Sequence, residues 1–184
     1  MTEAQRHPKF TFHIEDLESP RHAIPASVLV NILQRAQHAF ELIGAQIEGH
    51  EIKARARIPA AISERFQLVC EVPEPRSYAL PVTVGETNDL FGLEQAHRAF
   101  DTFQAVTRAI SGGDRSGILS LLPSVSIRRR ILESIRNMAP NAEARWKLEL
   151  LDESDKAFAA LDSNSIRFLD ETLVPAEQRE AVQE

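Results

Sequence analysis

The sequence predicts an α+β domain, with an antiparallel or mixed sheet of about four to five strands and amphipathic helices packed on one face. Two periodicities support this fold class. Apolar and polar residues alternate in several short stretches, as in half-buried strands, and apolar residues recur every three or four positions in longer stretches, as in helices. Short alternating stretches joined by tight turns favour antiparallel neighbours.

The chain opens with a predicted strand and a long predicted helix. Residues 10–14 alternate, with two phenylalanines and an isoleucine on one side. Residues 27–48 carry apolar side chains at spacings of three and four, which is typical of an amphipathic helix. Pro25 suits the start of this helix and Gly49 suits its end.

Three further strands are expected after this helix. Residues 51–58 alternate between small or apolar side chains and charged ones, and residues 66–72 and 77–84 alternate again on either side of a proline-containing turn. The last two stretches therefore predict a hairpin. Because Pro81 has no amide hydrogen to donate, we expect its strand to lie at the edge of the sheet.

The second half of the chain is predicted to be mainly helical. Helical spacing of apolar residues covers residues 93–110, 116–122 and 127–138, and a last short helix is expected at 163–173. Residues 146–151 alternate and predict one more strand. The predicted order is therefore β-α-β-β-β-α-α-α-β-α.

Composition fits one folded domain over residues 1–174, followed by a polar tail at 175–184 that we expect to fray. Hydrophobic residues make up 43% of the 184-residue chain, which is enough for a core. No stretch approaches the roughly 18 apolar residues of a membrane span. A single cysteine excludes an internal disulfide, and residues 1–9 lack the apolar segment of a secretory signal. We therefore expect a cytoplasmic protein.

No motif in the sequence predicts a catalytic residue, a metal site or a cofactor. The six histidines lack the spacing of a zinc protease, and the glycine-rich run at 111–117 lacks the spacing of a P-loop. Cys70 falls on the apolar side of its predicted strand, where we expect a small buried hydrophobe. An enzyme whose site is assembled from distant residues, such as His13, His22 or His38, stays open as an alternative.

Charge is unevenly distributed, and the basic residues are the candidate binding residues. Residues 148–184 hold ten acidic and three basic side chains, although the whole chain has a net charge of only −6. Basic residues gather in the predicted strand at 51–58 and in the predicted helix at 127–138, namely Lys53, Arg55, Arg57, Arg128, Arg129, Arg130 and Arg136. If both groups were adjacent, they would suit phosphates or an acidic protein. Internal pairing with the acidic C-terminal segment is the alternative.

Three segments resemble the N-terminal region of some uncharacterised bacterial proteins. They are Phe10 to Ile14, the run Arg21 to Pro25 before the long helix, and the hairpin strand Ser77 to Val84. The resemblance covers about half of the chain. It implies a bacterial origin and a module that precedes further sequence, and it implies no activity or functional residue.

The sequence thus favours a non-enzymatic bacterial interaction or regulatory module, with a stress or defence system as its setting. An exposed edge strand would dock a protein partner or a second copy by strand addition. The first alternative is a nucleic-acid-binding protein that uses the arginine-rich surface, and the second is an enzyme. No membrane, metal or cofactor is expected among its partners.

Overall fold

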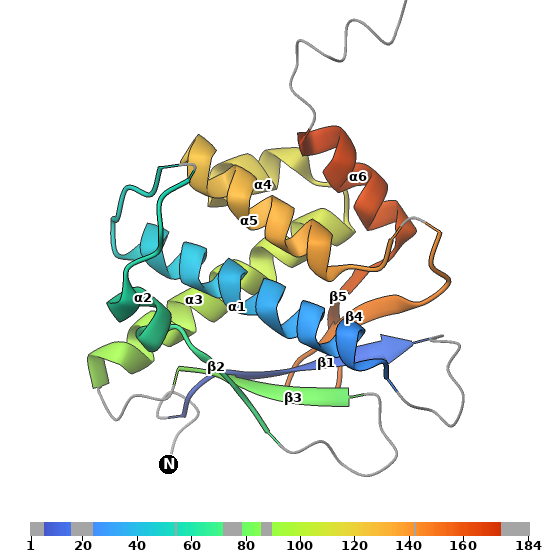
Figure 1. Ribbon diagram of the computed structural model, residues 1–184, viewed down its shortest axis with the longest axis horizontal. Coiled ribbons are helices and arrows are strands. Elements are labelled where there is room, and N and C mark those ends of the chain that lie inside the picture. The colour runs from blue at the N-terminus through green and yellow to red at the C-terminus, as the bar shows by residue number, and fades with distance from the viewer. Residues whose placement is uncertain are drawn as a thin grey trace, which may run out of the picture.

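The described residues form a five-stranded antiparallel sheet and six helices. The helices lie on one face of the sheet (Figure 1). The computed structural model describes residues 6–15, 24–53, 55–71, 79–85, 90–141 and 143–173. The predicted α+β class is confirmed, and the sheet is antiparallel rather than mixed. The predicted tail at 175–184 and His22 lie outside the described residues.

The strands lie in the order β2-β3-β1-β4-β5, so the first strand of the chain occupies the centre of the sheet. The elements in chain order are β1 (Lys9–Glu15), α1 (Ala26–Ile47), α2 (Ala60–Arg65), β2 (Leu68–Cys70), β3 (Ala79–Val84), α3 (Leu90–Ser111), α4 (Arg115–Leu121), α5 (Val125–Met138), β4 (Lys147–Leu151), β5 (Ala157–Leu161) and α6 (Ser163–Leu173).

Alternation in β1 divides its side chains between the helical layer and the open face. Phe10, Phe12 and Ile14 are buried beneath the helices, while the intervening residues point to the other side of the sheet. Phe10 lies opposite Val82 of β3, and Phe12 lies opposite Leu150 of β4. The central strand therefore aligns the apolar side chains of both neighbours on one face.

Helices α1 and α3 pack directly over this apolar face through aromatic contacts. The ring of Phe10 lies 5.7 Å from that of Phe40 on α1 and 5.6 Å from that of Phe103 on α3, measured between centroids. The Phe40 and Phe103 rings are 4.6 Å apart. Helix α5 packs on α1 at a distance from the sheet, so the helices form more than one layer (Figure 1).

The predicted strand at 51–58 is wrong. Its described residues form an irregular loop with a turn at Arg55, and the loop lies against α5 rather than in the sheet. The Ser126 hydroxyl donates to the Ile52 carbonyl over 3.1 Å, and Ile52 is only 4% exposed. The alternating pattern indicated which side chain is buried. The backbone of this segment, however, forms hydrogen bonds with side chains and not with a neighbouring strand.

The predicted hairpin is confirmed, but its details differ. Strand β2 spans only Leu68–Cys70, because the predicted start of the strand, Phe66, is the C-cap of helix α2. Strand β3 is interior, so the expected edge position of Pro81 is wrong. The Pro81 carbonyl accepts from the Glu71 amide over 2.9 Å, which places the missing proline amide toward the short strand β2, near the end of their pairing. Cys70 is exposed on this outer strand and not buried as expected.

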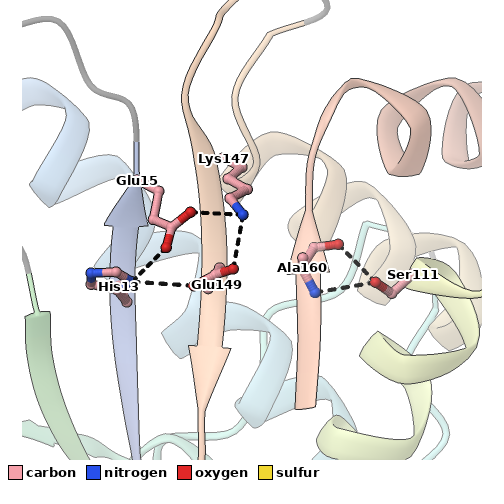
Figure 2. Close-up of polar contacts among 6 residues, drawn as sticks. All are labelled: His13, Glu15, Ser111, Lys147, Glu149 and Ala160. Carbon is pink, nitrogen blue, oxygen red and sulfur yellow. Dashed lines mark hydrogen bonds and ion pairs between the residues drawn. The ribbon is translucent and has the colours of Figure 1, made fainter. Parts of the chain in front are cut away.

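Strand β5 has no counterpart in the prediction, because Ala157–Leu161 contains no clear alternation. It forms a hairpin with β4 across a turn in which Asp155 adopts a φ of 58°. The Ser111 hydroxyl at the end of α3 both accepts from the Ala160 amide, over 3.1 Å, and donates to the Ala160 carbonyl, over 2.9 Å (Figure 2). A helix therefore satisfies the outward backbone groups of this edge strand at Ala160.

Gly44 allows α1 to approach Phe66, and replacing it tests this packing. A Cβ at Gly44 would lie 2.2 Å from the ring of the fully buried Phe66, so Gly44→Ala forces the ring or the helix to move. We expect Gly44→Ala to lower the free energy of unfolding by about 1–3 kcal/mol, measured by urea denaturation. Gly112→Ala is the control, since the nearest atom is 3.4 Å away. Equal stability of the two variants would contradict this packing.

Candidate functional site

The two groups of basic residues predicted from the sequence are neighbours in the fold. The segment 51–59 is called here the basic loop, and its described residues run along the N-terminal half of α5. The Arg130 guanidinium donates to the carbonyls of Lys53, over 3.2 Å, and Ala56, over 3.0 Å. One predicted binding residue therefore holds the backbone of the segment that carries three others.

The other arginines of α5 differ in how far their guanidinium groups are accessible to a binding partner. The Arg128 guanidinium donates over 2.9 Å to the Leu122 carbonyl, at the end of α4, where a positive charge is favourable. Arg129 is exposed and donates over 2.9 Å to Glu133, one turn further along α5. An exposed pair of this kind contributes little to stability, so Arg129 can exchange its partner.

Arg136 pairs with the acidic C-terminal segment, as the alternative interpretation of the charge pattern anticipated. Its guanidinium donates to both carboxylate oxygens of Asp170 on α6, over 2.8 and 3.3 Å. The hydrogen bond that Arg136 donates to Asp170 raises the pKa of Arg136. Arg136 therefore links α5 to α6 and is not among the basic residues that remain accessible to a binding partner.

Lys53, Arg55 and Arg57 are all exposed, and none has an acidic partner in the part of the chain that the structure describes. The surroundings do not neutralise them. Residues 48–65 and 124–138 together contain eight basic and four acidic side chains. The basic loop and the exposed side of α5 therefore form a locally positive surface on a chain of net negative charge.

A second polar constellation lies on the open face of the sheet (Figure 2). His13 of β1 is directly opposite Glu149 of β4, and Glu15 is directly opposite Lys147. The Lys147 ammonium lies 2.7 Å from Glu15 and 3.0 Å from Glu149, and the His13 Nδ1 atom lies 3.2 Å from Glu149. These four residues are called here the ionic quartet.

Electrostatics within the ionic quartet favour the charged forms of Lys147 and Glu149. Hydrogen bonds to Glu15 and Glu149 raise the pKa of Lys147. Partial burial by itself raises the pKa of Glu149, but hydrogen bonds from Lys147 and His13 outweigh it, so the pKa lies below its usual value. Opposite charges that face each other across adjacent strands stabilise the pairing of β1 and β4.

The sequence did not predict the ionic quartet, because its two halves are separated by more than 130 residues. His13 was named only as a residue of an alternative enzyme site. His38, named with it, lies elsewhere on the surface of α1, 3.7 Å from Glu41. Partial burial alone raises the pKa of Glu41, but hydrogen bonds, among them one with His38, lower it below its usual value.

Two surface pockets were also not predicted from the sequence. A pocket of about 400 Å³ lies between the start of α1 and the connection from α5 to β4, and Trp146 is among its lining residues. A cleft of about 290 Å³ lies beside the start of β1 and includes His97 and Asp101. His97 donates to the Arg6 carbonyl over 2.8 Å, which fixes its ring orientation. Neither pocket includes Cys70 or the basic loop.

Comparison with protein-family models, with curated proteins and with solved structures gave no match. Over the described residues, no helix has the combined length and apolar character that crossing a membrane would need.

Removing Arg130 tests whether it holds the basic loop in place. Arg130→Ala deletes the hydrogen bonds to Lys53 and Ala56. Because a hydrogen bond from a charged donor contributes about 1.5–3 kcal/mol, trypsin should cleave the basic loop of this variant at least about tenfold faster. Arg129→Ala is the matched control, since Arg129 bonds only along its own helix. Similar cleavage rates in both variants would show that the loop does not depend on Arg130.

Proposed function

We propose that this domain is a non-enzymatic interaction module that binds an acidic protein partner through the basic loop and the exposed side of α5. The observation that carries the proposal is that exposed cationic side chains project from the basic loop, whose backbone is held in place by hydrogen bonds. Arg130 and Ser126 bond three carbonyls of this loop, while the side chains of Lys53, Arg55 and Arg57 face solvent.

A fixed loop reduces the entropy that a complex loses when it forms. Two of its three cations are arginines, whose planar guanidinium groups can donate two parallel hydrogen bonds to a carboxylate. Arg129 would add a fourth cation by exchanging Glu133 for an acidic group of the partner. The chemistry of the surface therefore suits Asp and Glu side chains on a partner protein.

Nucleic acid is the second candidate, favoured by the same guanidinium groups, which also suit phosphate oxygens. Two features make it the weaker candidate. Arg128, Arg130 and Arg136 are engaged inside the fold, and the described residues of the basic loop include no aromatic side chain for base stacking.

A module that binds without reacting acts by recruiting or blocking its partner, so we propose a regulatory role. On the resemblance of its N-terminal segments we propose a bacterial origin, and as the setting for such a regulator we propose a stress or defence system.

The proposal is tested by removing the exposed cations of the basic loop together. In the triple variant Lys53→Ala, Arg55→Ala, Arg57→Ala, binding of fluorescent poly-L-glutamate, followed by anisotropy in 50 mM salt, should weaken at least about tenfold. The control removes the same charge from exposed arginines on α3 and α6, by Arg98→Ala, Arg108→Ala and Arg167→Ala. Equal losses in both triple variants would contradict a localised binding surface.

A 20-base-pair duplex in the same assay separates the two candidates. If the basic loop contacts three phosphates of a duplex, log affinity should fall with log salt with a slope of about −2.7. Binding of the duplex that is tighter than binding of poly-L-glutamate, and that the loop variant abolishes, would favour nucleic acid over an acidic protein.

A further inference from the structure

We propose that His13, Glu15 and Glu149 form a binding site for a divalent metal ion on the open face of the sheet, with Zn²⁺ as the ion that fits best. This inference is independent of the basic loop. It rests on the ligand geometry of the ionic quartet, on the role of Lys147 within it and on the position of β1 and β4 in the sheet.

The three side chains present their ligand atoms to one point. One nitrogen or oxygen atom from each lies within 4.8 Å of the other two. His13 Nδ1 is 3.2 Å from Glu149 Oε2 and 3.9 Å from Glu15 Oε1. Ligand atoms around a tetrahedral Zn²⁺ with bonds of 2.0–2.1 Å are about 3.3 Å apart, so the His13 and Glu149 atoms already have this spacing and Glu15 has to move closer.

Lys147 leaves these ligand atoms available. Its ammonium contacts Glu15 Oε2 and Glu149 Oε1, which are the carboxylate oxygens that do not face His13 (Figure 2). Each carboxylate therefore bonds Lys147 with one oxygen and faces the imidazole with the other. Partners of this kind orient ligating carboxylates in metal sites, so Lys147 is a positioning residue for both.

The ligand types select the kind of ion. One imidazole nitrogen and two carboxylate oxygens match Zn²⁺, whereas Ca²⁺ and Mg²⁺ prefer oxygen ligands alone. The His13, Glu15 and Glu149 side chains are 29, 36 and 16% exposed, so the site opens to solvent and water would complete the coordination. Three protein ligands with one open position are typical of zinc sites that are not purely structural.

The backbone holds the ligands with little freedom. Strands β1 and β4 are neighbours inside the sheet, and the His13–Glu149 and Glu15–Lys147 pairs occupy successive rows of one face. Sites built on strands are more precise than sites built on loops. With a neutral imidazole the ionic quartet carries a net charge of −1, which attracts a cation, although the Lys147 ammonium weakens that attraction.

The test is a calorimetric titration of the full chain with ZnCl₂ at pH 7.5. We expect one Zn²⁺ per chain, and an affinity at least tenfold lower in His13→Ala and in Glu149→Gln. His38→Ala is the matched control, because His38 also faces a glutamate but, among the described residues, is not grouped with a second carboxylate, and it should bind like the wild type.

Circular dichroism of the metal-free variants shows whether each is folded, and Glu15→Gln replaces any variant that is not. Co²⁺ supplies a second readout, because the visible absorption of a tetrahedral complex should appear in the wild type and disappear in His13→Ala. Unchanged Zn²⁺ affinity in His13→Ala and Glu149→Gln, or in Glu15→Gln where it replaces one of them, would overturn the proposal, as would no binding to the wild type at 1 mM Zn²⁺.

Discussion

The fold depends on the burial of one side of β1 beneath α1 and α3. Phe10 contacts aromatic rings from both helices, and its strand pairs with a neighbour on each side. An alternating strand can bury only every second side chain, so the same interaction that builds the core leaves His13 and Glu15 on the open face. The core and the ionic quartet are two consequences of one alternation.

Sequence periodicity predicted the fold class and most of its elements, because the long helices and β1 each bury one regular stripe. It was wrong at 51–58, where a strand-like alternation occurs in a loop that bonds to Ser126 and Arg130. It missed β5, whose short alanine-rich sequence has no preferred side. In both cases contacts between distant segments, rather than local pattern, determine the backbone.

The basic surface and the ionic quartet also differ in how far the sequence could predict them. The basic residues were recognisable in the sequence as runs of like charge, but their different structural roles were not. Only the fold shows that Arg130 supports the loop while Arg55 and Arg57 face solvent. The ionic quartet leaves no signal in the sequence. Its halves become neighbours only through the register of β1 with β4, which a single sequence does not specify.

The Ser111 hydroxyl has a consequence for assembly. By bonding both the amide and the carbonyl of Ala160, it occupies backbone groups that an incoming strand would need at β5. At the opposite edge, Gln37 bonds the Leu68 amide, while the backbone of Cys70 faces away from β3. Addition of a strand at β5 would therefore require the Ser111 hydroxyl to be displaced, which disfavours fibre growth from that edge of the sheet.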